Sequence, residues 1–300
     1  MTQEHTFDGL LETLHHGLSV LPDKSEENAR NTLQALWHAA AGTQVSPVVA
    51  QDLHLPPLSP DQISVLGLSV RSRLSGVPLA HLTERQNFMG LEYILNKGLY
   101  IPRKETELLA RTAIATIEEA FDLQEPATVA DLCTGIGTVA LAIAHYCENV
   151  SVVGTDIFAP AIAAAHVNAR HFGLEARARF FHADLFEPLE ALSLSRAVDL
   201  IVSAPPYISS AKVKGMAIEI AHHEPEEAFD AGPFGLSVFN KLISTAPDYL
   251  RSGGCLIFEC GQGQGEFLAK RILANRSYGE VCEIRDENGH VRVLKARIRP

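Results

Sequence analysis

The chain of 300 residues carries a formal net charge of −11, from 25 basic and 36 acidic residues. Broad binding to nucleic acid requires a basic surface that displaces counterions, so this charge argues against a nucleic-acid partner. The five cysteines form no C-x-x-C pair and no zinc-site spacing, and an odd number suits a reducing compartment. The sequence shows no signal peptide and no apolar run near the ~20 residues of a membrane helix. We therefore expect a cytoplasmic protein without a metal site or a membrane partner.

Residues 1–85 are predicted to form a small helical domain. Apolar residues recur at helical spacing from Phe7 to Leu18, and a second helix is predicted to begin at Ser25. The tetrapeptide at 59–62, SPDQ, is a capping box with proline at its first helical position, and it predicts a third helix. No catalytic spacing of titratable residues occurs here, so we interpret this domain as a substrate-recognition domain.

Residues 86–104 change to the period of a strand and predict a β-hairpin linker. Leu91, Tyr93 and Leu95 alternate with polar residues, a turn is predicted at 96–98, and the pattern resumes at 99–101. A helix is then predicted to run to about Phe121.

Residues 105–300 alternate strand and helix, which is typical of a parallel sheet with helices on its faces. Strands are predicted at 127–132, 150–156, 178–184, 198–203 and 255–261, and helices at 138–146, 160–172, 235–249 and 264–274. The end differs, because 280–285 and 291–298 flank a turn at 287–289 and predict an antiparallel hairpin. The fold class is therefore α/β: a Rossmann-like, mostly parallel sheet with an antiparallel C-terminal hairpin, preceded by helices.

Acidic residues end three successive predicted strands and favour an adenosine ligand. The first strand ends at Asp131 and is followed by Gly135 and Gly137, which allow a tight turn above the next helix. Asp156 ends the second strand, where a carboxylate can accept from both ribose hydroxyls. Asp184 ends the third and is placed to accept from the adenine amine, with Ile157 and Leu185 beside the ring.

The same residues favour S-adenosylmethionine over NAD or ATP. The carboxylate of Asp131 suits a cationic amino group and would repel phosphates, and the chain has no P-loop lysine. Ala140 occupies the third glycine position of the dinucleotide motif G-x-G-x-x-G. A dinucleotide oxidoreductase is therefore the less favoured enzyme class.

The segment VDLIVSAPPY, at 198–207, predicts a reaction site at the end of the fourth strand. Two consecutive prolines fix φ and remove two N–H donors, so the carbonyls of Ala204 and Pro205 remain available as acceptors. Ligands of open α/β sheets bind at this edge. Alternation along the strand should direct Ser203 to the other face.

With these motifs in place, the chain resembles the HemK/PrmC family of class I methyltransferases, which modify a glutamine amide of peptide-chain release factors. The resemblance covers nearly the whole chain: GVPLAHLTERQNFMGLEYIL resembles the interdomain segment, IPRKETELL the IPRPETE signature, and DLCTGIGTVALAIA the cofactor loop. EPEEAFDAGPFGL and LRSGGCLIFECGQGQ resemble later landmarks. The resemblance implies cofactor contacts from Cys133–Gly137, Asp156, Leu185 and position 204.

One departure lies within the site, because the family motif Asn-Pro-Pro-Tyr is Ala204-Pro205-Pro206-Tyr207 here. The family's asparagine accepts a hydrogen bond from the substrate amide, and removing such a contact from a transition state commonly costs a few kcal/mol. We therefore expect methyl transfer to a small-molecule amine, carboxylate, hydroxyl or thiol. The alternatives are glutamine methylation of a release-factor-like protein, ring closure of S-adenosylmethionine that releases methylthioadenosine, and a catalytically silent binding protein.

The predicted site residues fall into three groups. The predicted catalytic residues are Ala204, Pro205, Pro206 and Tyr207. The predicted cofactor-binding residues are Asp131, Cys133, Thr134, Gly135, Ile136, Gly137, Asp156, Ile157, Asp184, Leu185, Ser203 and Ala204. The predicted substrate-binding residues are Phe88, Arg103, Glu105, Thr106, Pro205, Tyr207, His222, His223 and Glu224. Within the last group, either histidine could deprotonate a nucleophile and the arginine could pair with a substrate carboxylate.

Overall fold

The computed structural model describes residues 3–120 and 126–300, which form two compact units. The helical unit comprises Met1–Lys104 together with Ala217–Glu224, and the sheet unit comprises Glu105–Met216 together with Pro225–Pro300. The segment 86–104, predicted as a linker, thus lies in the helical unit. None of the helices in the described part of the chain combines the length and the apolar character needed to cross a bilayer.

The helical unit packs its helices around one apolar core. Its helices are α1 (Gln3–Gly17), α2 (Ala29–Ala40), α3 (Pro47–Ala50), α4 (Pro60–Leu74), α5 (Leu79–Thr83) and α11 (Ile218–Ala221), with a 3₁₀ turn η1 (Ser25–Glu27). Leu33, Leu36 and Trp37 of α2 lie at the centre of that core and are at most 1 % exposed.

Two predicted helix starts in this unit have different outcomes. The capping box at Ser59 is confirmed, because its hydroxyl accepts from the Gln62 amide while the Gln62 side chain accepts from the Ser59 amide. The predicted start at Ser25 is wrong, because residues 25–27 form a separate 3₁₀ turn. Helix α2 begins at Ala29, and the Asn28 side chain caps it by accepting from the Asn31 amide.

The segment contains a hairpin, but both its strands and its turn differ from the prediction, because residues 99–101 form no strand. Strands β1 (Arg85–Phe88) and β2 (Leu91–Ile94) pair in antiparallel fashion. The turn is formed by Met89 and Gly90, with φ of 52° and 82°. The chain does turn at Lys97 and Gly98, where Gly98 has a φ of 79°, but this turn lies outside the hairpin. Asn-Lys-Gly is a strong local turn signal, whereas a methionine at positive φ gives none.

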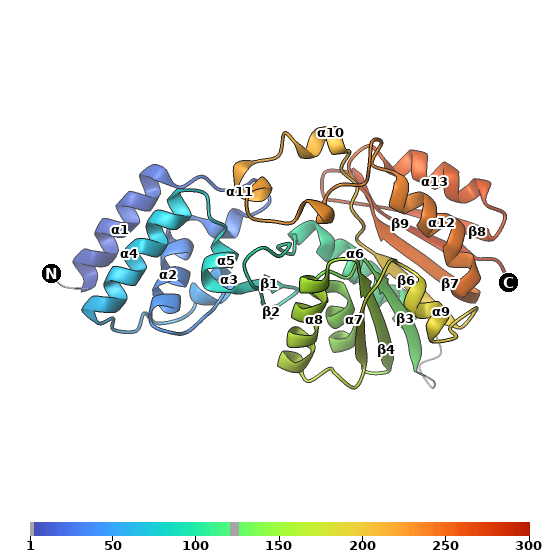
Figure 1. The fold of residues 1–300 in the computed structure, drawn as a ribbon, viewed down its shortest axis with the longest axis horizontal. Coiled ribbons are helices and arrows are strands. Elements are labelled where there is room, and N and C mark those ends of the chain that lie inside the picture. The colour runs from blue at the N-terminus through green and yellow to red at the C-terminus, as the bar shows by residue number, and fades with distance from the viewer. Residues whose placement is uncertain (1–2, 121–125) are drawn as a thin grey trace. The chain divides into compact units, whose positions relative to one another are not determined.

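The sheet unit contains a seven-stranded sheet in the order β5-β4-β3-β6-β7-β9-β8 (Figure 1). Its strands are β3 (Ala127–Leu132), β4 (Val150–Asp156), β5 (Ala178–His182), β6 (Val198–Ser203), β7 (Leu250–Glu259), β8 (Tyr278–Arg285) and β9 (Val291–Ile298). The first five strands are parallel, whereas β9 is antiparallel to both β7 and β8. The predicted fold class, including the antiparallel hairpin, is confirmed.

Helices cover both faces of this sheet. Helices α6 (Glu107–Ala120), α7 (Thr138–Tyr146) and α8 (Ala159–Phe172) pack together, and α9 (Glu187–Ala191), α12 (Ser237–Tyr249) and α13 (Gly265–Ala274) lie on the opposite face, as Figure 1 shows. Short elements complete the unit: η2 (Lys104–Thr106), α10 (Ser210–Val213) and η3 (Glu226–Ala228). Phe121, where we expected α6 to end, lies outside the described residues.

The strand registers bring four chain segments to one edge of the sheet. Leu132 of β3 is level with Thr155 of β4 and with Ser203 of β6, and Ser203 is level with Phe258 of β7. The residues that follow each of these strands therefore emerge side by side. This edge holds the cofactor loop, the predicted ribose site and the Pro-Pro-Tyr segment.

Candidate active site

The loop after β3 turns sharply because three of its residues adopt positive φ. Cys133, Gly135 and Gly137 have φ of 65°, 57° and 83°. The Thr134 amide donates to the Thr155 carbonyl at 2.9 Å and so ties the loop to β4. A Cβ atom on Gly137 would lie 3.0 Å from side-chain atoms of Leu141 and Phe180, whereas a Cβ on Gly135 would meet nothing within 4 Å. The loop therefore packs tightly at its end and leaves open space at its tip.

Asp131 fastens this loop to the first turn of α7. Its Oδ2 accepts from the Thr134 hydroxyl at 2.6 Å and from the Ala140 amide at 3.0 Å. The side chain is 1 % exposed, and its burial raises the pKa to about 7 although both hydrogen bonds oppose the shift. The carboxylate that we predicted to contact a cationic amino group thus also holds the loop against α7.

Asp156 connects the tip of β4 to the same loop. One carboxylate oxygen accepts from the Gly135 amide at 2.8 Å, and the other accepts from the Phe158 amide at 2.9 Å. Burial raises the pKa of this carboxyl, and the two amides act against that shift. The adjacent Ile157 is 56 % exposed and offers an apolar surface beside the carboxylate, whereas Leu185 is only 6 % exposed.

The third predicted acid is placed differently. Asp184 is about half exposed, and its Oδ2 lies 2.6 Å from the ammonium of Lys241. An adenine amine would have to share or displace this surface ion pair, which such pairs allow because each contributes little stability. The adenine contact of Asp184 stays a prediction.

The Ala204-Pro205-Pro206-Tyr207 segment leaves β6 directly beside the cofactor loop. Pro205 is buried, and its three neighbours in the segment are half-buried. No donor among residues 3–120 and 126–300 reaches the carbonyl oxygens of Ala204 or Pro205. The Ser203 hydroxyl donates to the Leu132 carbonyl on the neighbouring strand β3 at 2.6 Å. Two carbonyl acceptors therefore remain for a ligand.

Tyr207 is held at both ends. Its hydroxyl donates to Oε1 of Glu259 at 3.2 Å, and its carbonyl accepts from the Gln264 side chain at 3.1 Å. Glu259 ends β7, is 2 % exposed and also pairs with Arg292 at 3.4 Å. Burial raises the pKa of both Tyr207 and Glu259. The tyrosine is thus a neutral, fixed donor at the edge of the segment.

The structure divides the predicted substrate-binding residues between the two units. In the sheet unit, the charge of Glu105 raises the pKa of Tyr207, and the Thr106 hydroxyl lowers that of Glu259, so these residues lie near one another. Pro205 and Tyr207 also belong to the sheet unit, and the remaining five belong to the helical unit: Phe88, Arg103, His222, His223 and Glu224.

Within the helical unit, partners in the chain already occupy three of these side chains, including Glu224, which accepts from the Ile101 amide. Phe88 is 1 % exposed and packs edge-on against Tyr93. The Arg103 guanidinium, which we predicted to pair with a substrate carboxylate, pairs with Glu224. His222 is exposed and His223 is half-buried, and their role as bases stays a prediction.

Sequence reasoning missed Glu259 and Arg292. The signal was present, because an acid follows the apolar run CLIF at the end of a strand, as Asp131 and Asp156 follow theirs. Arg292 gave no such signal, because it lies inside the C-terminal hairpin, far along the chain from the residues that it contacts. Among the described residues, no cluster of three or more potential metal ligands occurs.

The strand order, the glycine loop after β3 and the acid at the tip of β4 define a class I methyltransferase, whose cofactor is S-adenosylmethionine. A family model for the methyltransferase small domain matches residues 114–232. The chain is 34 % identical over 279 residues to a release factor glutamine methyltransferase from Geobacter sulfurreducens, covering 93 % of each chain. It is 35 % identical over 228 residues to one from Moorella thermoacetica, covering 76 % of this chain and 77 % of that one. The chain belongs to the family of release factor glutamine methyltransferases.

Solved structures are also similar to the chain. A release factor-specific protein-(glutamine-N5) methyltransferase from Alicyclobacillus acidocaldarius aligns with a TM-score of 0.42 at 24 % identity, covering 67 % of this chain and 95 % of that one.

The residues at this edge fit S-adenosylmethionine. The open space at Gly135, the carboxylate of Asp156 and the exposed side chain of Ile157 would hold the amino-acid part, the ribose and the adenine ring, respectively. The bound cofactor supplies an electrophilic methyl group. The chain itself would contribute the carbonyl oxygens of Ala204 and Pro205 as acceptors for the incoming nucleophile.

Proposed function

We propose that the protein transfers a methyl group from S-adenosylmethionine to a glutamine side-chain amide of a release-factor-type protein. The sequence alone favoured a small-molecule acceptor, but relatives named as release factor glutamine methyltransferases match 93 % of the chain. That similarity favours the protein substrate. A cytoplasmic location and acceptor recognition by the helical unit belong to the same proposal.

The observation that carries the proposal is the pair of carbonyl oxygens at Ala204 and Pro205, which have no donor within the described chain. A primary amide is a poor nucleophile because its lone pair is delocalised, so its nitrogen must be oriented toward the methyl group. It has two N–H donors, and carbonyl oxygens are suitable acceptors for both. Positioning of this kind is worth up to ~7–11 kcal/mol of a reaction barrier.

The residue at position 204 affects the expected rate of glutamine methylation. With alanine in place of the family's asparagine, the backbone must supply acceptors that the amide side chain would otherwise provide. Tyr207 limits where the acceptor side chain can lie, because Glu259 fixes its hydroxyl and Gln264 fixes its backbone carbonyl. We therefore expect glutamine methylation that is slower than in a protein with asparagine at this position.

The missing asparagine is also the one observation that favours a small-molecule nucleophile. An amine or thiolate is a stronger nucleophile and needs less orientation by acceptors. Ring closure of the cofactor would need no acceptor at all.

The proposal is tested by incubating a bacterial release factor and S-adenosylmethionine with the wild type and with Ala204→Asn. We expect a mass gain of one methyl group on a glutamine with both enzymes, and a rate roughly two- to tenfold higher with Ala204→Asn, since one neutral hydrogen bond is worth roughly 0.5–1.5 kcal/mol. Ala211→Asn, at an exposed position of α10, is the matched control and should not change the rate.

Other products would overturn the proposal. Methylation by Ala204→Asn but not by the wild type would mean that the natural residue serves another acceptor. Methylthioadenosine without any methylated product would indicate ring closure.

A further inference from the structure

The segment that follows Tyr207 leaves the sheet unit and returns to it at a closed base. We call residues 208–230 the strap. At its base the Ile208 amide donates to the Phe229 carbonyl at 3.0 Å, and the Ala231 amide donates to the Ile208 carbonyl at 2.9 Å. The Asp230 carboxylate accepts from the Ser210 hydroxyl at 2.7 Å and from the Gly232 amide at 2.8 Å. The strap is therefore fixed to the sheet unit one residue beyond the Pro-Pro-Tyr segment.

The middle of the strap belongs to the other unit. Residues Ala217–Glu224, which include α11, group with the helical unit, whereas Met216 and Pro225 group with the sheet unit. Apolar packing does not account for all of this attachment, because Ile218 is 66 % exposed. Charged side chains contribute to the attachment as well.

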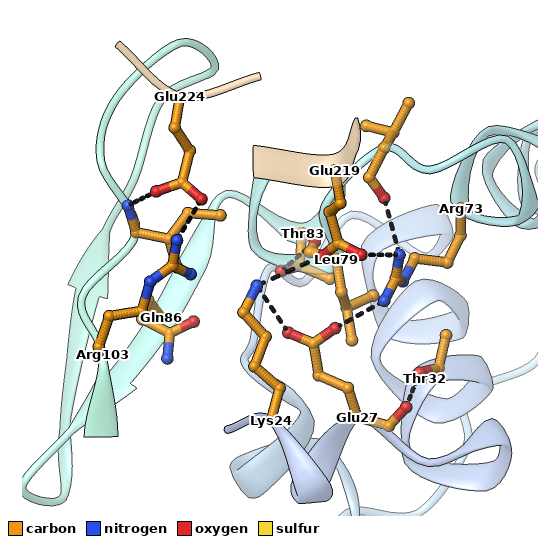
Figure 2. Close-up of polar contacts among 12 residues, drawn as sticks. Lys24, Glu27, Thr32, Arg73, Leu79, Thr83, Gln86, Arg103, Glu219 and Glu224 are labelled. Atoms are coloured by element: carbon orange, nitrogen blue, oxygen red, sulfur yellow. Dashed lines mark hydrogen bonds and ion pairs between the residues drawn. The ribbon is translucent and has the colours of Figure 1, made fainter. Parts of the chain in front are cut away.

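A buried cluster of four charges holds α11 (Figure 2). Glu219 accepts from Arg73 Nη1 at 3.1 Å and from the Lys24 ammonium at 3.4 Å, and Glu27 pairs with Arg73 at 3.0 Å and with Lys24 at 3.6 Å. The four residues are 2–8 % exposed. Two acids and two bases leave the cluster neutral only when Glu219 is present, so the strap completes the charge balance of the helical unit.

A second buried acid fixes the end of the same segment. Glu224 accepts from the Ile101 amide at 2.9 Å and pairs with the Arg103 guanidinium, as Figure 2 also shows. Its side chain is fully buried. The two anchors lie five residues apart along the chain, so they fix both the position and the direction of the strap.

We propose that Glu219 and Glu224 are positioning residues: through them the helical unit fixes the strap, and the strap in turn receives the backbone of the protein segment that carries the acceptor glutamine. This inference rests on the proposed function. The strap is fixed at its base beside Tyr207 and, within the helical unit, at the two buried anchors. Anchor loss therefore weakens acceptor binding and leaves cofactor binding unchanged.

Limited proteolysis of the full-length protein tests the anchors without any acceptor. Lys212 and Lys214 are exposed strap residues between the base and the anchors, and trypsin cleavage after them reports release of the strap. We expect Glu219→Gln and Glu224→Gln to be cleaved there at least tenfold faster than the wild type. Glu226→Gln, at an exposed strap position beyond the anchors, is the matched control and should be cleaved at the wild-type rate. Equal cleavage of all four proteins would overturn the proposal.

Steady-state kinetics test the role of the strap in binding the acceptor. In the two anchor variants we expect KM for the release factor to rise about tenfold or more, while the Kd for S-adenosylmethionine stays within twofold of wild type. The proposal is overturned if the strap is released and KM for the release factor does not change. If the wild type methylates no release factor, the proposed function fails, whereas the cleavage result still decides whether the anchors exist.

A neutral double variant separates a positioning role from simple unfolding. Glu219→Gln leaves one excess positive charge in the cluster, and Lys24→Met together with Glu219→Gln removes that excess. We expect the double variant to be cleaved at Lys212 and Lys214 more slowly than Glu219→Gln. A cleavage rate that rises further in the double variant would contradict an anchor based on charge balance.

Discussion

At the scale of single residues, acids at the ends of neighbouring strands have distinct physical surroundings. Asp131 is buried and bonded through one oxygen, Asp156 uses both oxygens for backbone amides, and Asp184 forms a surface ion pair. Glu259 is buried against Tyr207. A strand pattern predicts that such acids share an edge, but it does not reveal which of them are buried, because burial depends on the helices and loops packed over each.

The Tyr207 hydroxyl is expected to matter for turnover rather than for cofactor binding. Tyr207→Phe removes the donor to buried Glu259, which costs roughly 1–3 kcal/mol, and lets the ring lose its fixed position. We expect kcat to fall about tenfold or more at an unchanged Kd for S-adenosylmethionine, as measured by methyl-transfer kinetics and calorimetry. Tyr278→Phe also removes a buried hydroxyl that donates to a carbonyl, at Ile243, and serves as the control. An equal loss of kcat in both variants would argue against a special role for Tyr207.

Asp131 makes the stability of the sheet unit dependent on pH. Its pKa is about 7 in the fold against 3.8 for a free side chain, so the folded state binds more protons between these values and stability falls as pH rises through them. At about 1.4 kcal/mol per pKa unit, the loss reaches about 4 kcal/mol by pH 7.

Asp131→Asn removes this titration and can keep both hydrogen bonds, because a single oxygen accepts them. Urea denaturation at pH 4.5 and pH 7 should therefore show a smaller decrease in unfolding free energy for the variant than for the wild type. An unchanged decrease would assign the pH dependence to other buried acids.

At the scale of elements, the sequence predicted the regular structure of the sheet unit but not the connections that use unusual backbone. The alternation of apolar strands and amphipathic helices predicted β3 to β7 and the final hairpin. The hairpin in the helical unit was predicted with the wrong turn, because Met89 adopts a conformation that its residue type disfavours. Likewise, Ser25 carries a helix-start signal, but Asn28 caps the helix. Tertiary packing decides between such competing local signals.

Replacement of the two glycines of the cofactor loop should affect different properties, namely stability for Gly137 and cofactor affinity for Gly135. Gly137→Ala places a Cβ atom 3.0 Å from Leu141 and Phe180 at a φ of 83°, so we expect the free energy of unfolding to fall by roughly 1–3 kcal/mol. Gly135→Ala meets open space at a φ of 57°, so we expect a smaller loss of stability.

For Gly135→Ala the larger effect is expected on the cofactor, whose amino-acid part would meet the added methyl group. Calorimetry should show a Kd for S-adenosylmethionine at least several-fold above that of the wild type. Wild-type affinity in this variant would place the cofactor away from the loop tip.

At the scale of the whole molecule, the helical unit depends on residues that lie far apart in the sequence. From the sequence, Arg73 at the end of α4 is expected to be an ordinary surface residue, because a basic side chain in the last turn of a helix is common. Its acidic partner Glu219 lies 146 residues further along the chain. No local pattern links the two, so the sequence predicted neither the cluster nor the inclusion of 217–224 in this unit.

Arg73→Met should destabilise the helical unit selectively. It leaves two buried acids with one base, and breaking a buried ion pair commonly costs 3–5 kcal/mol. Trp37 is the one tryptophan of the sequence and is 1 % exposed in the core of this unit, so its fluorescence reports the unfolding of this unit. We expect its urea midpoint to fall in the variant.

Cofactor binding provides the internal control for that experiment. The residues that would hold S-adenosylmethionine all belong to the sheet unit, so binding should persist at urea concentrations that have already unfolded the region around Trp37. Simultaneous loss of both signals would mean that the two units unfold as one.

The 146-residue separation between Arg73 and Glu219 has a consequence for biosynthesis. At roughly 5–20 residues per second, a ribosome adds that stretch in about 7–30 s. During this interval the nascent N-terminal helices carry two cations opposite a single anion and lack the short helix that completes them. The buried charge cluster of the first-made region therefore reaches its native balance only after Glu219 has been synthesised.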